Sequence, residues 1–382
     1  MHICCLEKGR RERDEIMKIL MHTMHMSTSI GASLQACALG KKLLSIGHSP
    51  YLLYYVPPFY SDVLSSNVHC SSFRDVFSYI INGGNREKER LRFVDFKNKC
   101  HSPLTNKYTG IDSLLSDVPA FDAYICGSDQ VWNPMITHYD MSYFFTFVNN
   151  GAKKISYAAS IGRDVVSLDI EEYLSTGLSH MDYIGVREDT AVSAIKKILP
   201  DMDITQNIDP TFLLDKEEWR TMYSQPQSNL PKRYILYYPI KETELGISLL
   251  AEMKRKYALP CVSFSSSFRK AEGVDLNLHG IGPAEFLYLC NNAEMVLTNS
   301  FHGFALSVIH KKKVICFTKP HQNTRMESLS RLLNLQDLMI SSVGEVKSKK
   351  WDNVWSSCYK SIAARIKQEQ NRADAYLRKA LG

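Results

Sequence analysis

Short apolar segments alternate with segments of helical periodicity along this chain, and this alternation restricts the possible folds more than any other feature. The first strand is predicted to open at Met17, in MKILMHT, and residues 31–44 then repeat apolar side chains at helical spacing up to Gly47. Further strands are predicted at 51–56, 123–126, 154–158, 183–186 and 205–208, with a helix at 190–199. Because βα units build parallel sheets covered by helices, the expected fold class is α/β with a doubly wound sheet.

The alternation resumes after a polar, proline-containing segment, SQPQSNLPKR at 224–233, which has the composition of a linker. Strands are predicted at 234–238, 261–264, 295–298 and 314–317, between helices at 244–257, 283–291 and 302–310. The tail, 351–381, carries apolar residues on one helical stripe. We therefore expect an N-terminal extension at 1–16, a first domain at 17–225, a second domain at 234–345 and a C-terminal helix at 350–382.

The composition is that of a folded globular protein. Of 382 residues, 45% are hydrophobic and 23% are charged, which argues against a disordered chain. The formal net charge of +6 is small, and the basic residues are too dispersed to indicate nucleic-acid binding. The longest apolar run, Tyr51–Val56, is far shorter than the ~18 residues that a membrane span requires. Residues 1–14 lack the apolar core of a signal peptide.

The cysteines show no metal-binding spacing. None of the ten forms a C-x-x-C pair, and several, such as Cys126 and Cys316, lie within apolar strand-like runs where a free thiol acts as a small hydrophobe. This usage favours a reducing, cytoplasmic environment.

Chemistry is expected where strands end, because open α/β sheets bind ligands at the carboxyl ends of their strands. The strand at 123–126 is followed by Gly127, Ser128, Asp129 and Gln130, with Trp132 shortly after. Glycine permits close backbone approach to a ligand, and the polar residues supply donors and acceptors. The alternative interpretation is an ordinary turn with an Asx cap. The next strand is followed by a second polar segment, which contains Ser160 and Arg163.

Two further strand ends carry candidates for binding an anion. Arg187 follows the strand at 183–186 and can hold a phosphate or carboxylate through two hydrogen bonds, although it could simply pair with Glu188 or Asp189. Ser300 follows the strand at 295–298 as a natural N-cap, which puts His302 in the first helical turn. Free backbone N–H groups there attract an anion, and His302 is a candidate acid or base. The alternative is a histidine with no catalytic role.

We expect neither a metal nor a cofactor. Asp201-Met202-Asp203 matches a short metal-binding pattern that arises easily by chance, and His22 and His25 have no carboxylate nearby in the sequence. The sequence contains no Walker A loop and no G-x-G-x-x-G.

The motifs together resemble those of the polysaccharide pyruvyl transferases. The resemblance runs from about residue 17 to 340 and rests on motifs in a fixed order: GASLQA at 31–36, GSDQVWNP at 127–134, KKISYAASIG at 153–162, VRED at 186–189, DPTFLL at 209–214, Trp219, SFHGFALSVIHKK at 300–312, and Arg325. It implies two Rossmann-like domains that face each other across a cleft, the GT-B architecture, with the last helix crossing back to the first domain.

The resemblance also implies an activity, the transfer of pyruvate from phosphoenolpyruvate onto two hydroxyls of a sugar to form a cyclic ketal. By this resemblance His302 is the general acid/base and Arg187 holds the donor, while Ser300, Gly303 and the first-turn amides complete the anion site. Some members have an arginine where this chain has Ser300. A second cation must then come from elsewhere, and Arg325, Arg163 and Lys311 are the candidates.

The partners follow from the same resemblance. We expect phosphoenolpyruvate as donor, and as acceptor a galactose- or glucose-type sugar, carried by a lipid-linked oligosaccharide at the cytoplasmic face of the membrane. The residues expected to line the cleft follow the strands of the first domain: Gly127, Ser128, Asp129, Gln130, Trp132 and Ser160. Two other functions remain open at this stage: a nucleotide-sugar glycosyltransferase of the same architecture, and a sugar-binding protein of polysaccharide assembly without activity.

Overall fold

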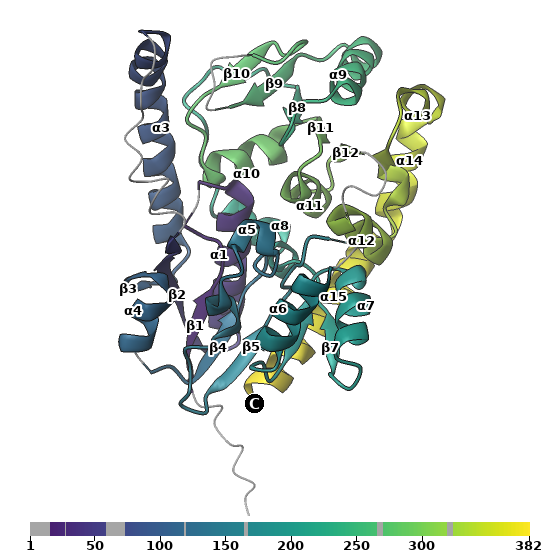
Figure 1. The fold of residues 1–382 in the computed structure, drawn as a ribbon. Coiled ribbons are helices and arrows are strands. Elements are labelled where there is room, and N and C mark those ends of the chain that lie inside the picture. The colour runs from purple at the N-terminus through teal and green to yellow at the C-terminus, as the bar shows by residue number, and fades with distance from the viewer. Residues whose placement is uncertain are drawn as a thin grey trace, which may run out of the picture.

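The chain forms two lobes, each built around a parallel sheet (Figure 1). The structure, a computed structural model, describes residues 16–26, 28–58, 73–117, 120–163, 167–265, 270–318 and 324–382. The predicted extension at 1–16 therefore lies, except for its last residue, outside the described residues. Ile16 itself is exposed.

The sheet of the first lobe has the order β3-β2-β1-β4-β5, and all its neighbouring strands are parallel. Its strands are β1 (Lys18–His22), β2 (Ser49–Val56), β3 (Leu104–Thr109), β4 (Ala123–Cys126) and β5 (Lys153–Ser156). A small parallel pair, β6 (Ile184–Val186) and β7 (Ile204–Gln206), extends this sheet through isolated bridges beside β5. The helical elements of this lobe are α1 (Ile30–Ser45), α3 (Phe73–Lys99), α4 (Gly110–Ser116), α5 (Pro134–Thr137), η1 (Met141–Phe144), α6 (Leu168–Leu178), α7 (Asp189–Ile198), η2 (Pro210–Leu213) and α8 (Lys216–Arg220).

The sheet of the second lobe has the order β10-β9-β8-β11-β12-β13, which is the strand order of a complete Rossmann fold. Its strands are β8 (Ile235–Tyr238), β9 (Cys261–Phe264), β10 (Leu276–Leu278), β11 (Met295–Thr298), β12 (Lys313–Phe317) and β13 (Met339–Ile340). The helical elements are α9 (Glu244–Tyr257), α10 (Pro283–Asn292), α11 (Phe301–Ile309), α12 (Thr324–Leu333), η3 (Gln336–Leu338) and α13 (Val343–Ser348). The predicted α/β class with two Rossmann-like domains is confirmed.

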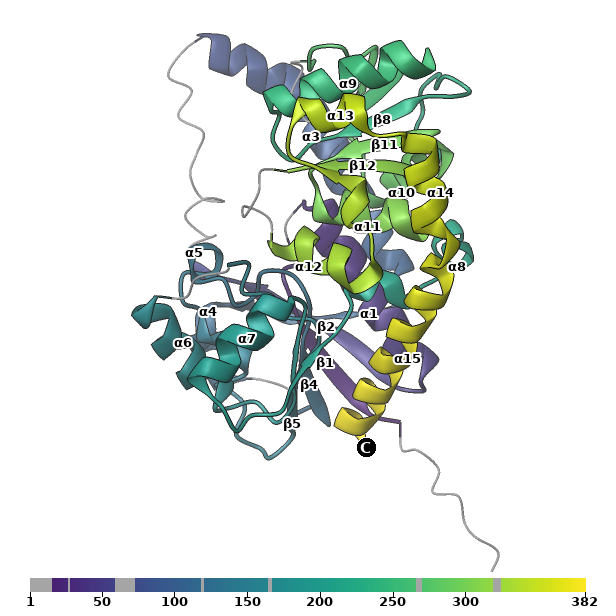
Figure 2. The ribbon, with the colours of Figure 1, turned by 90° about the vertical axis from the view of Figure 1, so that its right-hand side faces the viewer.

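The C-terminal segment joins the two lobes along one side (Figure 2). It forms two helices, α14 (Trp351–Lys360) and α15 (Ile362–Leu381), where the sequence predicts one continuous stripe. In α14, Trp355 Nε1 donates a hydrogen bond to the carbonyl of Val314 in the second lobe, 3.0 Å away. In α15, the Tyr376 hydroxyl donates to the carbonyl of Ser156 in the first lobe, 2.7 Å away. The predicted return of the last helix to the first domain is therefore confirmed.

Three short strands were not predicted: β3, β10 and β13. Each lies at the edge of a sheet, where one side of the strand has no neighbour and polar residues are tolerated. The β3 sequence, LTNKYT, shows only one buried side chain, so it lacks the apolar run that marks a central strand. In the chain, β3 follows the long helix α3.

The expectation of free thiols is wrong for one pair of cysteines. Cys37 in α1 and Cys100 at the end of α3 form a disulfide, with a Cα–Cα distance of 5.1 Å. Their separation of 63 residues hides this proximity in the sequence. Among the described residues, the free cysteines are all buried: Cys126, Cys261, Cys290, Cys316 and Cys358. Within the same part of the chain, none of the helices has the length and apolar character needed to cross a bilayer.

Candidate active site

A cavity of about 1440 Å³ lies between the lobes, where strands of both sheets end. From the first lobe it is lined by Thr23 after β1, by Val56 at the end of β2 and by Asp129 after β4. From the second lobe it is lined by Tyr238 at the end of β8 and by Asn299 after β11. The cavity therefore occupies the position where open α/β sheets bind their ligands.

His302 enters this cavity from the first turn of α11. Ser300 is the N-cap, and its Oγ accepts a hydrogen bond from the backbone N–H of Gly303 at 3.2 Å. The Thr298 hydroxyl in turn accepts from the Ser300 N–H and donates to the carbonyl of Tyr238. These bonds fix the turn between β11 and α11 and place the imidazole of His302 at the N-terminus of a helix. The free N–H groups and the dipole of a helix N-terminus stabilise a nearby anion.

A buried carboxylate, Asp209, lies beneath His302. Its Oδ2 is 3.7 Å from His302 Nε2, and it also accepts hydrogen bonds from Arg187 Nη1 at 3.0 Å and Ser128 Oγ at 3.1 Å. Its Oδ1 accepts from the N–H and hydroxyl of Thr211. Burial alone would raise the pKa of Asp209, but His302, Arg187 and the Thr211 N–H hold that pKa well below its usual range. Asp209 is therefore an anion that joins the imidazole to the guanidinium.

Arg187 lies behind the cavity wall. Its guanidinium is buried, bonds Glu188 through Nε at 3.0 Å, and stacks over the ring of Phe301, whose centroid is 4.4 Å from Cζ. Although burial opposes its charge, Glu188 and Asp209 raise the pKa of Arg187 above its ordinary value. Arg187 and His302 thus converge on Asp209 as neighbours, but Arg187 is not among the described residues that line the cavity. The open alternative of pairing with Glu188 is realised, whereas Asp189 pairs with Arg331.

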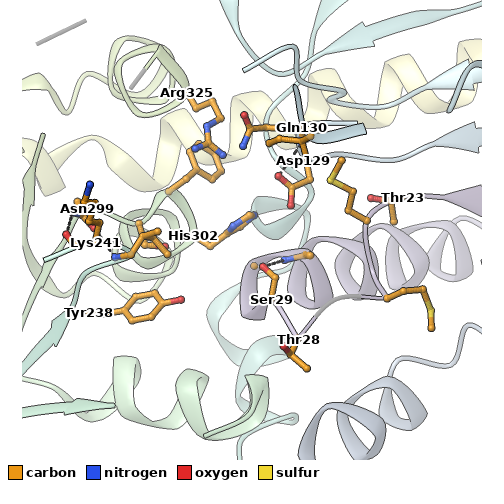
Figure 3. Close-up of a pocket in the computed structure, with 18 of the residues that line it drawn as sticks. Thr23, Thr28, Ser29, Asp129, Gln130, Tyr238, Lys241, Asn299, His302 and Arg325 are labelled. Carbon is orange, nitrogen blue, oxygen red and sulfur yellow. Dashed lines mark hydrogen bonds between the residues drawn. The ribbon is translucent and has the colours of Figure 1, made fainter. Parts of the chain in front are cut away.

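Among the described arginines, Arg325 on α12 is the one that lines the cavity. Burial, followed by the like charge of Arg187, lowers the pKa of Arg325, while the carboxylate of Asp129 opposes this effect. Figure 3 shows Arg325, His302, Asp129 and Gln130 around the same space. A guanidinium, an imidazole and a helix N-terminus therefore face one cavity, and together they provide a site for a small polyanion.

Gly31, in the first turn of α1, packs directly against the imidazole. A Cβ atom at this position would lie 1.9 Å from His302 Nδ1. The glycine therefore makes room for a side chain from the opposite lobe. The sequence alone predicted neither the contact between Gly31 and His302 nor the role of Asp209. Both residues do belong to motifs that carry the family resemblance, Gly31 to GASLQA and Asp209 to DPTFLL.

The other predicted residues fall into two groups. Ser300 lines the cavity with Asp129 and Gln130, whereas five residues are not among the described residues that line it: Gly127, Ser128, Gly303, Trp132 and Ser160. Trp132 is fully buried and stacks on Phe144, so its prediction as a cleft residue is corrected: it is a core residue. The Ser160 carbonyl accepts a hydrogen bond from the Trp132 N–H, which places Ser160 in the loop packing rather than in the cavity.

Arg163 and Lys311, predicted as possible donor-binding cations, are placed elsewhere. Lys311 follows the C-terminal end of α11, opposite to His302, and it is exposed. Arg163 follows β5 and lies near Tyr139: the hydrogen bond to Asp169 raises the pKa of the Tyr139 hydroxyl, and the charge of Arg163 opposes this effect. Neither residue is among those described as lining the cavity. Of the three candidates for the second cation, only Arg325 is among the described residues that line the cavity.

The fold and the cavity together define a two-domain α/β protein of the GT-B architecture, with an anion-binding helix N-terminus beside a histidine. A sequence model of the family described as polysaccharide pyruvyl transferase matches residues 30–319. The chain belongs to this family. No match was found among curated proteins.

Solved structures show a distant likeness in fold. The UDP-GlcNAc 2-epimerase from Neisseria meningitidis has a TM-score of 0.49 and 10% identity over 95% of this chain and 100% of that one. The UDP-GlcNAc 2-epimerase from Methanocaldococcus jannaschii has a TM-score of 0.46 and 11% identity, covering 90% and 92%. The glycotransferase of kitacinnamycin has a TM-score of 0.43 and 11% identity, covering 96% and 97%.

Proposed function

We propose that this protein transfers pyruvate from phosphoenolpyruvate onto two hydroxyls of one sugar, which forms a cyclic ketal and releases phosphate. Family membership supports a transferase that acts in polysaccharide synthesis. The single observation that carries the proposal is the position of His302, in the first turn of α11 and in the same cavity as Arg325. This arrangement suits a small, highly charged donor that must be protonated on carbon.

Donor binding is assigned to the cation and the helix end that face the cavity. Arg325 pairs with the phosphate or the carboxylate of the donor, and the free N–H groups of the first turn of α11 bind the other anionic group. Ser300 caps this helix where some family members have an arginine, so Arg325 supplies the charge. Arg187 acts from behind, where it holds Asp209 and packs on Phe301.

His302 is assigned the role of general acid. Its imidazolium donates a proton to the methylene carbon of the donor, which creates the methyl group and leaves positive charge at the central carbon. A sugar hydroxyl attacks that carbon, phosphate departs, and a second hydroxyl closes the ring. Asp209, an anion 3.7 Å from Nε2, stabilises the imidazolium before the proton is transferred.

The acceptor is assigned to the first-lobe part of the cavity. The cavity exceeds the ~300–1,000 Å³ of ordinary ligand sites, so it has room for a sugar chain as well as for the donor. Tyr54 and Lys107, which face each other across β2 and β3, line this end. We propose a galactose- or glucose-type acceptor from a capsule or exopolysaccharide precursor, lipid-linked and reached from the cytoplasmic face of the membrane.

The test is to incubate the protein with phosphoenolpyruvate and a panel of glycosides, and to measure phosphate release together with the mass of the sugar product. We expect release that depends on both substrates. His302→Gln should fold normally and lose turnover, whereas the exposed control His180→Gln should keep it. Turnover of His302→Gln at the wild-type rate would remove His302 from the mechanism. Binding of a nucleotide sugar without binding of phosphoenolpyruvate would favour a glycosyltransferase, and binding of an oligosaccharide alone would favour a non-catalytic protein.

A further inference from the structure

Asp129 has a left-handed backbone conformation, which is uncommon for residues other than glycine. Its φ of 82° lies in the left-handed region, which favours glycine and which asparagine and aspartate tolerate better than other residues. The conformation is held in place because the Asp129 carbonyl accepts hydrogen bonds from the N–H groups of Val131 and Ser160. Strain that the surrounding structure maintains is concentrated at functional sites, and here it directs a carboxylate toward the cavity (Figure 3).

Within the described part of the chain, one oxygen of the Asp129 carboxylate accepts a hydrogen bond and the other has no donor. Oδ1 accepts a hydrogen bond from the Gln130 N–H at 2.9 Å, which fixes the orientation of the group. Burial by itself would lower the pKa of Arg187 and of Arg325, and the nearby negative charge of Asp129 opposes this effect at both guanidinium groups. Asp129 therefore stands on the first lobe, opposite His302 on the second, beside the arginine assigned to the donor.

The other described carboxylates that line the cavity are less suited to chemistry. Glu242 and Glu244 are exposed and lie at the N-terminal end of α9, where an acidic side chain stabilises the helix by itself. Asp129 is half-buried and is held by a fixed loop. Glu242 thus serves as a control, because it is a carboxylate that lines the same cavity from the second lobe and is not held in a fixed loop.

We propose that Asp129 is the general base that takes the proton from the first acceptor hydroxyl as that hydroxyl attacks the donor carbon. This inference rests on the proposed pyruvyl transfer. It assigns the two proton-transfer roles to opposite lobes, with His302 as the acid from α11 and Asp129 as the base from the loop after β4. It also assigns the first attacking hydroxyl to the side of the cavity formed by the first lobe.

The steps balance with these two groups alone. His302 gives its proton to the methylene carbon; the first hydroxyl then forms a C–O bond to the central carbon, and its proton passes to Asp129. The bond to phosphate breaks with its electron pair on the departing oxygen, which takes the proton from Asp129. The second hydroxyl forms the second C–O bond, and its proton passes to His302. Both residues return to their starting charge, and the products are the ketal and hydrogenphosphate.

Two substitutions remove the base without disturbing the loop. Asp129→Asn keeps an acceptor oxygen for the Gln130 N–H and tolerates a positive φ, and Asp129→Gly suits that φ better than any other residue. We expect Asp129→Asn to lower turnover by about 10²-fold or more while the dissociation constant for phosphoenolpyruvate stays within about threefold, because general-base catalysis contributes this much. Glu242→Gln should retain turnover.

Added formate should restore turnover of Asp129→Gly by about 10-fold or more, because a small carboxylate can occupy the vacated space and act as the base. A purely structural role for Asp129 predicts no effect of formate. Turnover of Asp129→Asn within about threefold of wild type, or failure of formate to restore Asp129→Gly, would overturn the proposal. Phosphate release by the wild-type protein tests the pyruvyl transfer itself. The variants of Asp129 test only its role as general base, so this role can be rejected without rejecting the proposed reaction.

Discussion

Gly31 and His302 touch across the boundary between the lobes, and a Cβ atom on Gly31 would lie 1.9 Å from His302 Nδ1. The imidazole of His302 is carried by a helix of the second lobe, but it packs against residues of both lobes. On its other side, Nε2 faces Asp209, which is also a first-lobe residue. The position of the proposed acid thus depends on how the two lobes meet.

Gly31→Ala should displace the imidazole and leave the rest of the fold in place. A shift of about 1 Å at a catalytic group can cost about 10²-fold in rate, so we expect turnover to fall by about that factor with only a small change in the affinity for phosphoenolpyruvate. Steady-state kinetics with a binding isotherm would measure both quantities. Gly344→Ala is the matched control, because its Cβ would meet nothing closer than Ser342 Oγ at 3.9 Å. Equal turnover in the two variants would argue against this contact.

Arg187→Met should weaken the fold more than the binding of the donor. Removing the guanidinium leaves Asp209 and Glu188 as buried anions without their shared partner, and breaking such a buried network typically costs about 3–5 kcal/mol. Urea denaturation of the purified variant measures this loss in the free energy of unfolding. A stable variant with poor affinity for phosphoenolpyruvate would instead place Arg187 in direct contact with the donor.

Arg325→Met should weaken the binding of the donor more than it weakens the fold. Arg325 lines the cavity and its assigned partner is the donor, so its loss should raise the KM for phosphoenolpyruvate. A charge-assisted hydrogen bond contributes about 1.5–3 kcal/mol, which corresponds to about a 10- to 100-fold change. Arg163→Met is the control, an arginine from the alternative set that is not described as lining the cavity. Similar KM values for the two variants would show that the second cation lies elsewhere.

The free energy of unfolding should decrease as the pH is lowered. This decrease should begin at about pH 6.5, above the pH range in which carboxylates titrate. Burial lowers the pKa of His22 and of His310 to about 3 each, and of His25 to about 4, from an ordinary 6.5. Below pH 6.5 the unfolded chain therefore binds protons that the folded chain does not, so unfolding becomes more favourable as pH falls toward these values. Each histidine contributes a slope of about 1.4 kcal/mol per pH unit.

Urea denaturation between pH 7 and 5 measures this slope, and His310→Gln should reduce it by the share of one histidine. An unchanged slope in His310→Gln would show that His310 is protonated in the folded protein.

The residue pattern alone was enough to predict the two α/β domains and the strand ends that carry the site. Apolar runs bounded by turns identify central strands, because a strand that is buried on both faces is built mostly from apolar side chains. The cap at Ser300 places His302 in a first helical turn, because capping is a local property of the chain. Edge strands such as β3 could not be recognised, since exposure on one side removes their apolar signal.

Only the tertiary structure decided which side chains meet. Asp209 and His302 are far apart in the sequence and belong to different lobes, and no periodicity encodes the 3.7 Å between them. The same holds for the choice of Arg325 over Arg163 and Lys311, and for the burial of Arg187, because the packing of the lobes determines which charge faces the cavity and which is held behind it. Local patterns determine elements, whereas contacts between distant elements depend on how the two sheets pack together.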